Sequence, residues 1–307
     1  MIKYLYSSGK EQKIEKLQKP RSGAWIFVYD ITPEEVEKLI SLGFDETIIE
    51  DATDYFEVPR FETIDGIQYL LTRYAVDAGG GDVPTAPILI ALSDNYILTI
   101  SHRKAEFLDD FVHGRRDIIT TKHIDALLLM LDTIIKEYDK HLISIRRLLA
   151  KYLGNIKNVT ENDLQRIVSL ESQLLDYTNS LISTADALNV MLRSRRDLTL
   201  DQEDTEVLED LTQDINQIIS SVEYVSKAVQ SVRSTHEALI GHKLNATMKT
   251  LTAFTIILTV PTIISGIFGM NTWLPFTTGP ISFVIVMTII TIVAYVVMRW
   301  FAKNGWL

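Results

Sequence analysis

The sequence predicts an α+β membrane protein: an N-terminal mixed α/β cytosolic domain, an antiparallel helical hairpin, one very long helix and two C-terminal transmembrane helices. Three observations support this fold class. Short β-branched and aromatic runs end near residue 118, a helical period replaces them from about residue 121, and residues 250–298 contain no Asp, Glu, Lys, Arg or His. We therefore expect four segments, at residues 1–120, 121–200, 201–250 and 251–307.

The first segment shows the pattern of several strands and one clear helix. Strands are predicted where apolar runs are bounded by turn residues, at residues 2–6, 24–29, 68–76, 86–92 and 96–102. A Thr-Pro-Glu-Glu sequence from Thr32 begins a helix that should end at Gly43. The glycine-rich residues 77–82 lack the Lys-Ser/Thr pair and the following helix of a phosphate-binding loop, so we interpret them as a connection.

Two amphipathic helices follow. The first, residues 123–152, gathers its leucines and isoleucines on one side, and the second runs from a capping sequence at Thr160 to about Arg195. Gly154 and Asn155 between them predict an antiparallel hairpin.

A third helix is predicted from about residue 204 to residue 271 without a stop signal before the membrane. One side carries an apolar heptad seam, interrupted once by His236: Leu211, Ile215, Ile218, Val222, Val225, Val229, Val232 and Leu239. Roughly opposite runs a polar register in which Lys227 is the one cation: Asp210, Gln213, Gln217, Ser220, Tyr224, Ser231, Ser234, Ala238 and Gly241. We expect the seam to pack against protein and the polar register to remain in contact with water.

The charge-free stretch is long enough to cross a bilayer twice, since about 20 helical residues match the hydrocarbon thickness. The Pro- and Gly-containing residues 272–280 divide it into spans at 251–270 and 281–300, and few soluble cores contain two such helices. Because the flanks are basic and the connecting loop has no Lys or Arg, both termini should be cytoplasmic. The flanking cations are Lys243, Lys249, Arg299 and Lys303, and the interfacial tryptophans are Trp273, Trp300 and Trp306.

A narrow stripe of polar and small side chains follows the first span at alternating spacings of three and four residues. Its members are Asn245, Met248, Thr252, Thr255, Thr259, Thr262, Gly266 and Gly269. Such a stripe is typical of close helix packing with hydrogen bonds between helices, or of the wall of a water-filled path enclosed by several copies. Because it continues the polar register of the preceding helix, a conduit is favoured over a two-span coiled-coil receptor or scaffold.

Composition argues against several classes of function. The chain has no cysteine, so it offers no disulfide or thiolate metal site, and its formal net charge of −10 suits cations rather than nucleic acid as partners. Its six histidines lack zinc-ligand spacing, and neither a nucleophile elbow nor a Walker loop is present. We therefore do not expect an enzyme.

A path without carboxylates suits a hydrated ion. Mg²⁺ gives up water reluctantly and needs strong anionic ligands in exchange, whereas amide, hydroxyl and backbone oxygens can hold its water shell. A ring of Asn271 side chains at the outer mouth would suit such an ion, with Met248 and Leu251 at the cytosolic neck. Asn271 also fits the simpler role of a helix C-cap.

These residues resemble the CorA magnesium transporter family. The resemblance rests on Gly269-Met270-Asn271 ending the first of two C-terminal spans, the Asn-Ala-Thr-Met-Lys-Thr-Leu-Thr sequence of residues 245–252, Pro261 and Gly266 inside the span, and the terminal Trp306-Leu307. It implies a homopentamer in the cell membrane, an ion path lined by the long helices, and closing controlled by Mg²⁺, which is both cargo and regulator. The implied pore positions are Asn245, Met248, Leu251 or Thr252, Thr262, Gly266 and Asn271.

Two departures from the family pattern stand out. Thr259 replaces a frequent Met, which makes one constriction wider or wetter, and the outer loop at residues 272–280 has no carboxylate to recruit cations. Met270 favours magnesium, with cobalt or nickel as further cargo, over the zinc-transporting branch, which remains the alternative within the superfamily.

An acidic zone opens the third helix: Glu203, Asp204, Glu206, Glu209, Asp210 and Asp214. Carboxylates that meet between subunits repel each other unless a divalent cation lies among them, so such a zone suits a magnesium sensor. By the resemblance, Asp210 falls at a sensor aspartate, and Asp214 lies one turn later. We take Asp77 or Asp82 of the first segment as the candidate partner. The alternative is a solvated helix start favoured by the helix dipole.

Overall fold

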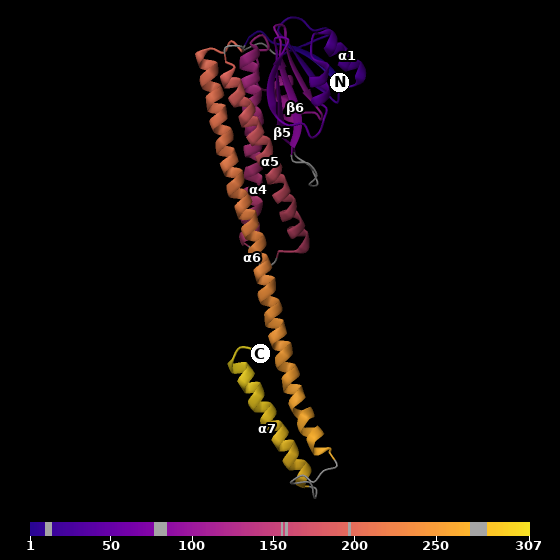
Figure 1. Cartoon of the computed structure of the whole chain (residues 1–307), viewed down its shortest axis with the longest axis vertical. Coiled ribbons are helices and arrows are strands. Elements are labelled where there is room, and N and C mark those ends of the chain that lie inside the picture. The colour runs from indigo at the N-terminus through magenta and orange to yellow at the C-terminus, as the bar shows by residue number, and fades with distance from the viewer. Residues whose placement is uncertain (10–13, 77–84, 155, 157–158, 196–197, 271–280) are drawn as a thin grey trace. The chain divides into compact units, whose positions relative to one another are not determined.

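The computed structural model describes residues 1–9, 14–76, 85–154, 156, 159–195, 198–270 and 281–307, with the backbone alone at residue 282. By packing, the chain divides into two units, Met1–Arg233 and Ser234–Leu307, hereafter unit 1 and unit 2. Helix α6, Gln202–Phe268, contributes to both units (Figure 1).

Unit 1 contains one mixed sheet with the strand order β2-β1-β3-β7-β6-β5-β4 (Figure 1). The central strands β3 and β7 pair in parallel, and the other described neighbours pair antiparallel. β6 is buried at every position, as expected of a strand covered on both faces. The strands are β1 (Ile2–Tyr6), β2 (Glu15–Leu17), β3 (Ala24–Tyr29), β4 (Arg60–Ile64), β5 (Ile67–Ala75), β6 (Thr85–Leu92) and β7 (Tyr96–Ser101).

Two separate cores lie on the two faces of this sheet. Because strand side chains alternate between faces, Ile26 and Val28 join the core with α1 (Pro33–Ser41) and α2 (Glu46–Asp51), while Trp25 and Phe27 join the other. This second core includes the apolar sides of α4 (His123–Gly154), α5 (Glu161–Arg193) and α6. The short helices η1 (Glu106–Leu108) and α3 (Asp109–Val112) lead from β7 toward α4.

Local signals place the helices where the sequence predicts them. The Thr160 hydroxyl accepts from the Asp163 N–H at the start of α5, and the Glu35 carboxylate accepts from the Thr32 N–H at the start of α1. Gly43 follows α1 with φ of 97°, a left-handed conformation that glycine adopts without strain.

The apolar seam of α6 is buried from Leu211 to Val232, as predicted, whereas its last member, Leu239, is half-buried. From Leu211 to Val232 its residues are at most 8% exposed, and all belong to the core with α4 and α5. His236, which interrupts the apolar pattern, is itself only 8% exposed, so burial along this side continues through the histidine.

Several short elements are absent from the prediction. β2 and β4 are edge strands rich in charged residues, α2 has six residues, and η1 and α3 have three and four. Elements this short do not repeat a hydrophobic period, so tertiary pairing and packing determine them. The predicted loop at residues 77–82 and the sensor candidates Asp77 and Asp82 lie outside the described residues.

Unit 2 consists of the end of α6 and of α7 (Ile281–Lys303), which lie beside each other (Figure 1). Both helices are long and apolar enough to cross a membrane, and only 6% and 0% of their most hydrophobic windows are buried. A core helix of a soluble protein would be mostly buried, so this exposure supports the prediction of two spans.

Candidate ion path

The predicted pore positions are exposed along α6 and the two residues that follow it. Those that the structure describes are Asn245, Met248, Leu251, Thr252, Thr255, Thr259, Thr262, Gly266, Gly269 and Met270. Asn271 lies outside the described residues. The sequence pattern therefore corresponds to a continuous surface over ten of the eleven predicted positions.

A different side of the same helix is covered. Ala253 is fully buried, and Ile257, Val260, Pro261, Ile264 and Phe268 are half-buried. Residues two apart lie about 200° apart around a helix, so Thr255 is opposite both Ala253 and Ile257, and Thr262 is opposite Ile264. The polar stripe is thus turned away from the covered side.

Helix α7 lies beside this part of α6 in unit 2 (Figure 1). The Thr250 hydroxyl donates to the carbonyl of Trp306 at 3.2 Å, and Phe301 is 4% exposed with its ring 5.4 Å from that of Trp306. Since α7 takes the apolar side of α6, the polar stripe remains available to water or to another copy of the chain.

Three threonines of the stripe direct their hydroxyl hydrogens into the helix. Thr255 donates to the Leu251 carbonyl at 2.9 Å, Thr259 to the Thr255 carbonyl at 2.8 Å, and Thr262 to the Leu258 carbonyl at 3.1 Å. A hydroxyl has one hydrogen and two lone pairs, so these oxygens keep acceptor capacity on the exposed side. Waters bound to a cation point their hydrogens outward, so oxygens that accept hydrogen bonds can bind these waters.

Backbone hydrogen bonds close the C-terminal end of α6, where two glycines lie. The Gly269 N–H donates to the Ser265 carbonyl at 2.9 Å and the Gly266 carbonyl at 3.2 Å, and Met270 N–H to Ile267 at 3.3 Å. A side chain added at Gly266 would meet nothing within 4 Å. Packing among the described residues therefore does not require a glycine at this position. A neighbouring helix that approached closely would require one, because only a small residue lets two backbones come near each other.

The predicted sensor aspartates lie on the surface of unit 1. Asp210 and Asp214 are both exposed on α6. Nearby, Asp201 and Asp204 cap the helix reciprocally, and burial together with the neighbouring carboxylates of Asp201 and Asp125 raises the pKa of Asp204. Among the described residues, no three His, Asp or Glu side chains are placed to hold a metal ion.

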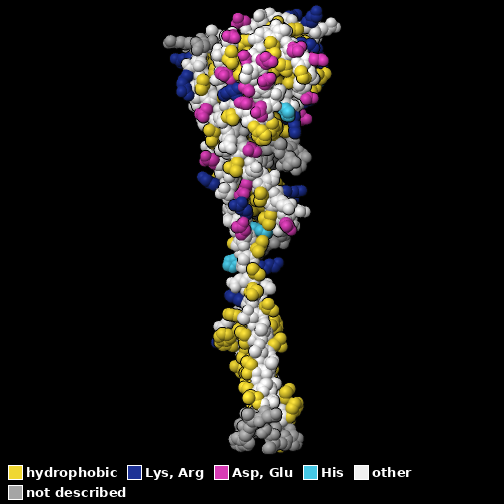
Figure 2. Space-filling model, turned by 45° about the vertical axis from the view of Figure 1, so that its right-hand side comes forward, with side chains coloured by type: hydrophobic (Ala, Val, Ile, Leu, Met, Phe, Trp, Pro, Cys, Tyr) yellow, Lys and Arg dark blue, Asp and Glu magenta, His cyan; other side chains and the backbone are white. Residues whose placement is uncertain are grey.

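Charge is distributed unevenly between the units. Figure 2 shows acidic side chains over the surface of unit 1 and mainly hydrophobic ones on the spans. Beyond Glu237 the sequence has no Asp or Glu. The spans therefore offer a cation neutral oxygen atoms and no carboxylate.

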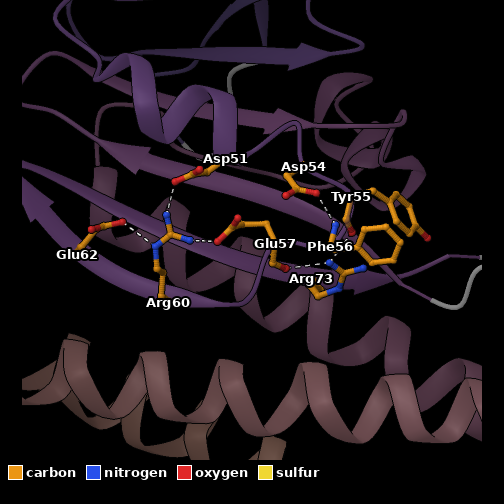
Figure 3. A network of polar contacts seen from close by, with 8 residues as sticks. All are labelled: Asp51, Asp54, Tyr55, Phe56, Glu57, Arg60, Glu62 and Arg73. Atoms are coloured by element: carbon orange, nitrogen blue, oxygen red, sulfur yellow. Dashed lines mark hydrogen bonds and ion pairs between the residues drawn. The ribbon is translucent and has the colours of Figure 1, made fainter.

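Unit 1 contains a polar network that the sequence pattern does not predict (Figure 3). Arg60 pairs with Asp51, Glu57 and Glu62, while Arg73 donates to the carbonyls of Tyr55 and Glu57 and to both oxygens of Thr85. Arg73 thereby anchors the loop that borders a pocket of about 230 Å³ against α5. The contacts of Arg60 are with residues close to it in sequence, whereas those of Arg73 join β5 to the preceding loop and to β6. Both depend on how the loop folds against the sheet, which spacing along one element does not reveal.

Comparison with known proteins gives one consistent family. The family model described as CorA-like Mg²⁺ transporter protein matches residues 21–303. The cobalt/magnesium transport protein CorA of Methanocaldococcus jannaschii is 28% identical over 298 residues, covering 92% of this chain and 91% of that protein.

Two solved structures share the fold. The complete structure of the CorA magnesium transporter from M. jannaschii has a TM-score of 0.87 at 24% identity and covers 100% of this chain and 99% of that one. The ZntB cytoplasmic domain from Vibrio parahaemolyticus has a TM-score of 0.62 at 12% identity, and the match covers 79% of this chain and 98% of that domain.

Proposed function

Because this chain belongs to the CorA-like Mg²⁺ transporter family, we propose that it is a channel through which hydrated Mg²⁺ crosses a cell membrane. The family consists of divalent cation transporters and not of enzymes, and its cobalt/magnesium relatives make Co²⁺ a second candidate cargo. The channel mechanism, the stoichiometry and the regulation described below are parts of this proposal.

One observation carries the proposal: the polar stripe of α6 is exposed opposite the side that α7 covers. Its threonine oxygens can accept hydrogen bonds from the water shell of a cation. An ion that keeps its water avoids the large cost of dehydrating Mg²⁺. Asn271 would hold the hydrated ion at the outer mouth, and Met248 and Leu251 would form the neck.

A single helix cannot enclose a path, so the proposal requires several copies. We take the state to be a homopentamer with α6 around the axis and α7 outside, in which Asn245, Thr252, Thr255, Thr259, Thr262, Gly266, Gly269 and Met270 complete the wall. With the basic flanks on the cytoplasmic side, both termini are cytoplasmic. The membrane potential supplies about 4.6 kcal/mol for a double charge at ~100 mV, so no nucleotide is needed.

Cytosolic Mg²⁺ regulates the channel in this proposal. Asp210 and Asp214 are exposed carboxylates on α6, and the described residues of one chain contain no complete metal site. A second subunit would supply the remaining ligands. Bound Mg²⁺ would then hold the carboxylates together and stabilise a closed state.

The test is an ion flux assay on the full chain in proteoliposomes. An inside-negative potassium diffusion potential should drive uptake of Mg²⁺ and Co²⁺, and a protonophore added under potassium clamp should leave it unchanged. Parallel assays with Ni²⁺ and Zn²⁺ measure the selectivity among divalent cations. If no divalent cation entered, or if only Zn²⁺ entered and required a proton gradient, the proposed function would be wrong.

A further inference from the structure

The basic side chains that flank the spans have no acidic side chain in the same part of the sequence. Lys243, Lys249, Arg299 and Lys303 belong to residues 238–307, which contain no Asp or Glu side chain. Arg299 Nη1 donates to the Tyr295 hydroxyl at 3.3 Å, a contact that leaves its charge uncompensated. Counterions for this cluster must therefore come largely from outside the spans and their flanks.

Two of these cations share the outer side of α7. Phe301 is buried, and Val297, one turn earlier, is half-buried, which marks the side toward α6. Arg299 and Lys303 are each two residues from Phe301, about 200° around the helix, and both are exposed. They lie one turn from each other, with Tyr295 one further turn into the span.

Aromatic side chains gather at the C-terminal end of α7 and in the turn that follows it. Trp300 is 57% exposed, and the C-terminal turn folds back through a 3.0 Å bond from the Trp306 N–H to the Phe301 carbonyl. The contact between Thr250 and Trp306 keeps the start of the first span beside the end of the second. Exposed indole and phenol rings beside cations are typical of the level of lipid headgroups.

We propose that Arg299 and Lys303, flanked by Tyr295 and Trp300, bind the headgroup phosphate of an anionic phospholipid. The inference rests on the proposed function only in placing α7 in the bilayer with its outer side toward lipid. A guanidinium donates two parallel hydrogen bonds to phosphate oxygens, and the ammonium adds a second charge. A zwitterionic headgroup carries its own ammonium, so an anionic lipid is preferred.

The test measures lipid selectivity of the full chain in phosphatidylcholine vesicles that contain spin-labelled phosphatidylglycerol or spin-labelled phosphatidylcholine. The wild-type protein should immobilise phosphatidylglycerol preferentially. The double variant Arg299→Gln/Lys303→Gln should lower that preference by about 25-fold, since each of the two basic residues near the surface contributes about a fivefold factor. The charge-preserving variant Arg299→Lys/Lys303→Arg should retain most of it.

Lys227→Gln is the matched control, because it removes an exposed lysine of α6 within unit 1. It should leave the selectivity unchanged. Excess inorganic phosphate in the buffer should displace little of the bound lipid at constant ionic strength.

An assembled double variant with wild-type selectivity would overturn the inference, and so would equal displacement by free phosphate. If the double variant did not assemble, the single variant Lys303→Gln would be measured instead. A reduced preference for phosphatidylglycerol would support the inference, and an unchanged preference would overturn it. Flux measured in the same vesicles separates the two claims. Retained flux without lipid preference rejects the lipid site alone, whereas retained preference without flux rejects the channel alone.

Discussion

At the scale of single residues, the threonine hydroxyls of α6 would decide what the proposed path can hold. Their hydrogens are used inside the helix, so each presents an acceptor oxygen to the exposed stripe. An acceptor wall matches the outward hydrogens of a hydrated cation, whereas direct coordination of Mg²⁺ would need carboxylates. These positions can be found from spacing alone, but the direction of each hydroxyl hydrogen cannot.

Thr259→Val should lower Mg²⁺ flux by roughly threefold to tenfold, the equivalent of one lost hydrogen bond, because the valine keeps the shape and removes the acceptor. Thr288→Val on α7 is the control, since its exposed hydroxyl also donates within its helix, to the Val284 carbonyl at 2.7 Å. Tracer uptake in proteoliposomes measures both. Equal losses in the two variants would contradict a special role for the α6 stripe.

Asn271→Ala should abolish uptake without preventing assembly, because the amide oxygen that receives the hydrated ion is lost. Asn304→Ala serves as the control, since this exposed asparagine lies at the end of α7 and donates to the Trp300 carbonyl. Uptake and size-exclusion profiles of both variants check the prediction. Wild-type flux in Asn271→Ala would remove the residue from the outer mouth.

At the scale of elements, α6 has one buried side and one exposed side. Its apolar seam packs into the core of unit 1, and its polar register stays exposed. Long periodic helices like this one are predictable because the same residue spacing recurs over many turns. The edge strands β2 and β4 and the pocket beside Arg73 were not predicted, since pairing and packing with distant segments create them.

Ile215→Ala should lower the free energy of unfolding by about 2–5 kcal/mol, because Ile215 is fully buried in the seam and its truncation leaves a cavity. Ser220→Ala on the exposed register should change it by less than about 0.5 kcal/mol. Denaturant unfolding of both variants gives the comparison. A cost for Ile215→Ala no greater than for Ser220→Ala would argue against the seam as a stabilising interface.

At the scale of the whole molecule, acidic and apolar residues belong to different parts of the chain. Asp and Glu side chains gather on unit 1 and are absent after Glu237, so the proposed regulation by a cation and its proposed passage would use different chemistry. The family and the two spans could be predicted from sequence. The choice between Asp77 and Asp82 as the partner of Asp210 could not, because the spacing of residues in one chain does not show which of them would face Asp210 in another subunit.

Asp210→Ala should weaken the protection that Mg²⁺ gives unit 1 against protease, because one carboxylate of the proposed intersubunit site is removed. Asp214→Ala should act in the same direction. Asp186→Ala, an exposed aspartate on α5, is the control. Cleavage rates with and without Mg²⁺ measure the effect, and unchanged protection in Asp210→Ala would exclude this residue from the sensor.

The central claim, that the polar stripe of α6 lines the ion path, is tested most directly by thiol accessibility. The chain has no cysteine, so single cysteines introduced at Thr255, Thr262, Ile257 or Ile264 are the only thiols present. The account predicts that a charged, membrane-impermeant thiol reagent modifies Thr255→Cys and Thr262→Cys and blocks their flux, while Ile257→Cys and Ile264→Cys, on the covered side of the helix, remain unmodified. Modification of the latter pair with protection of the threonine positions would contradict it.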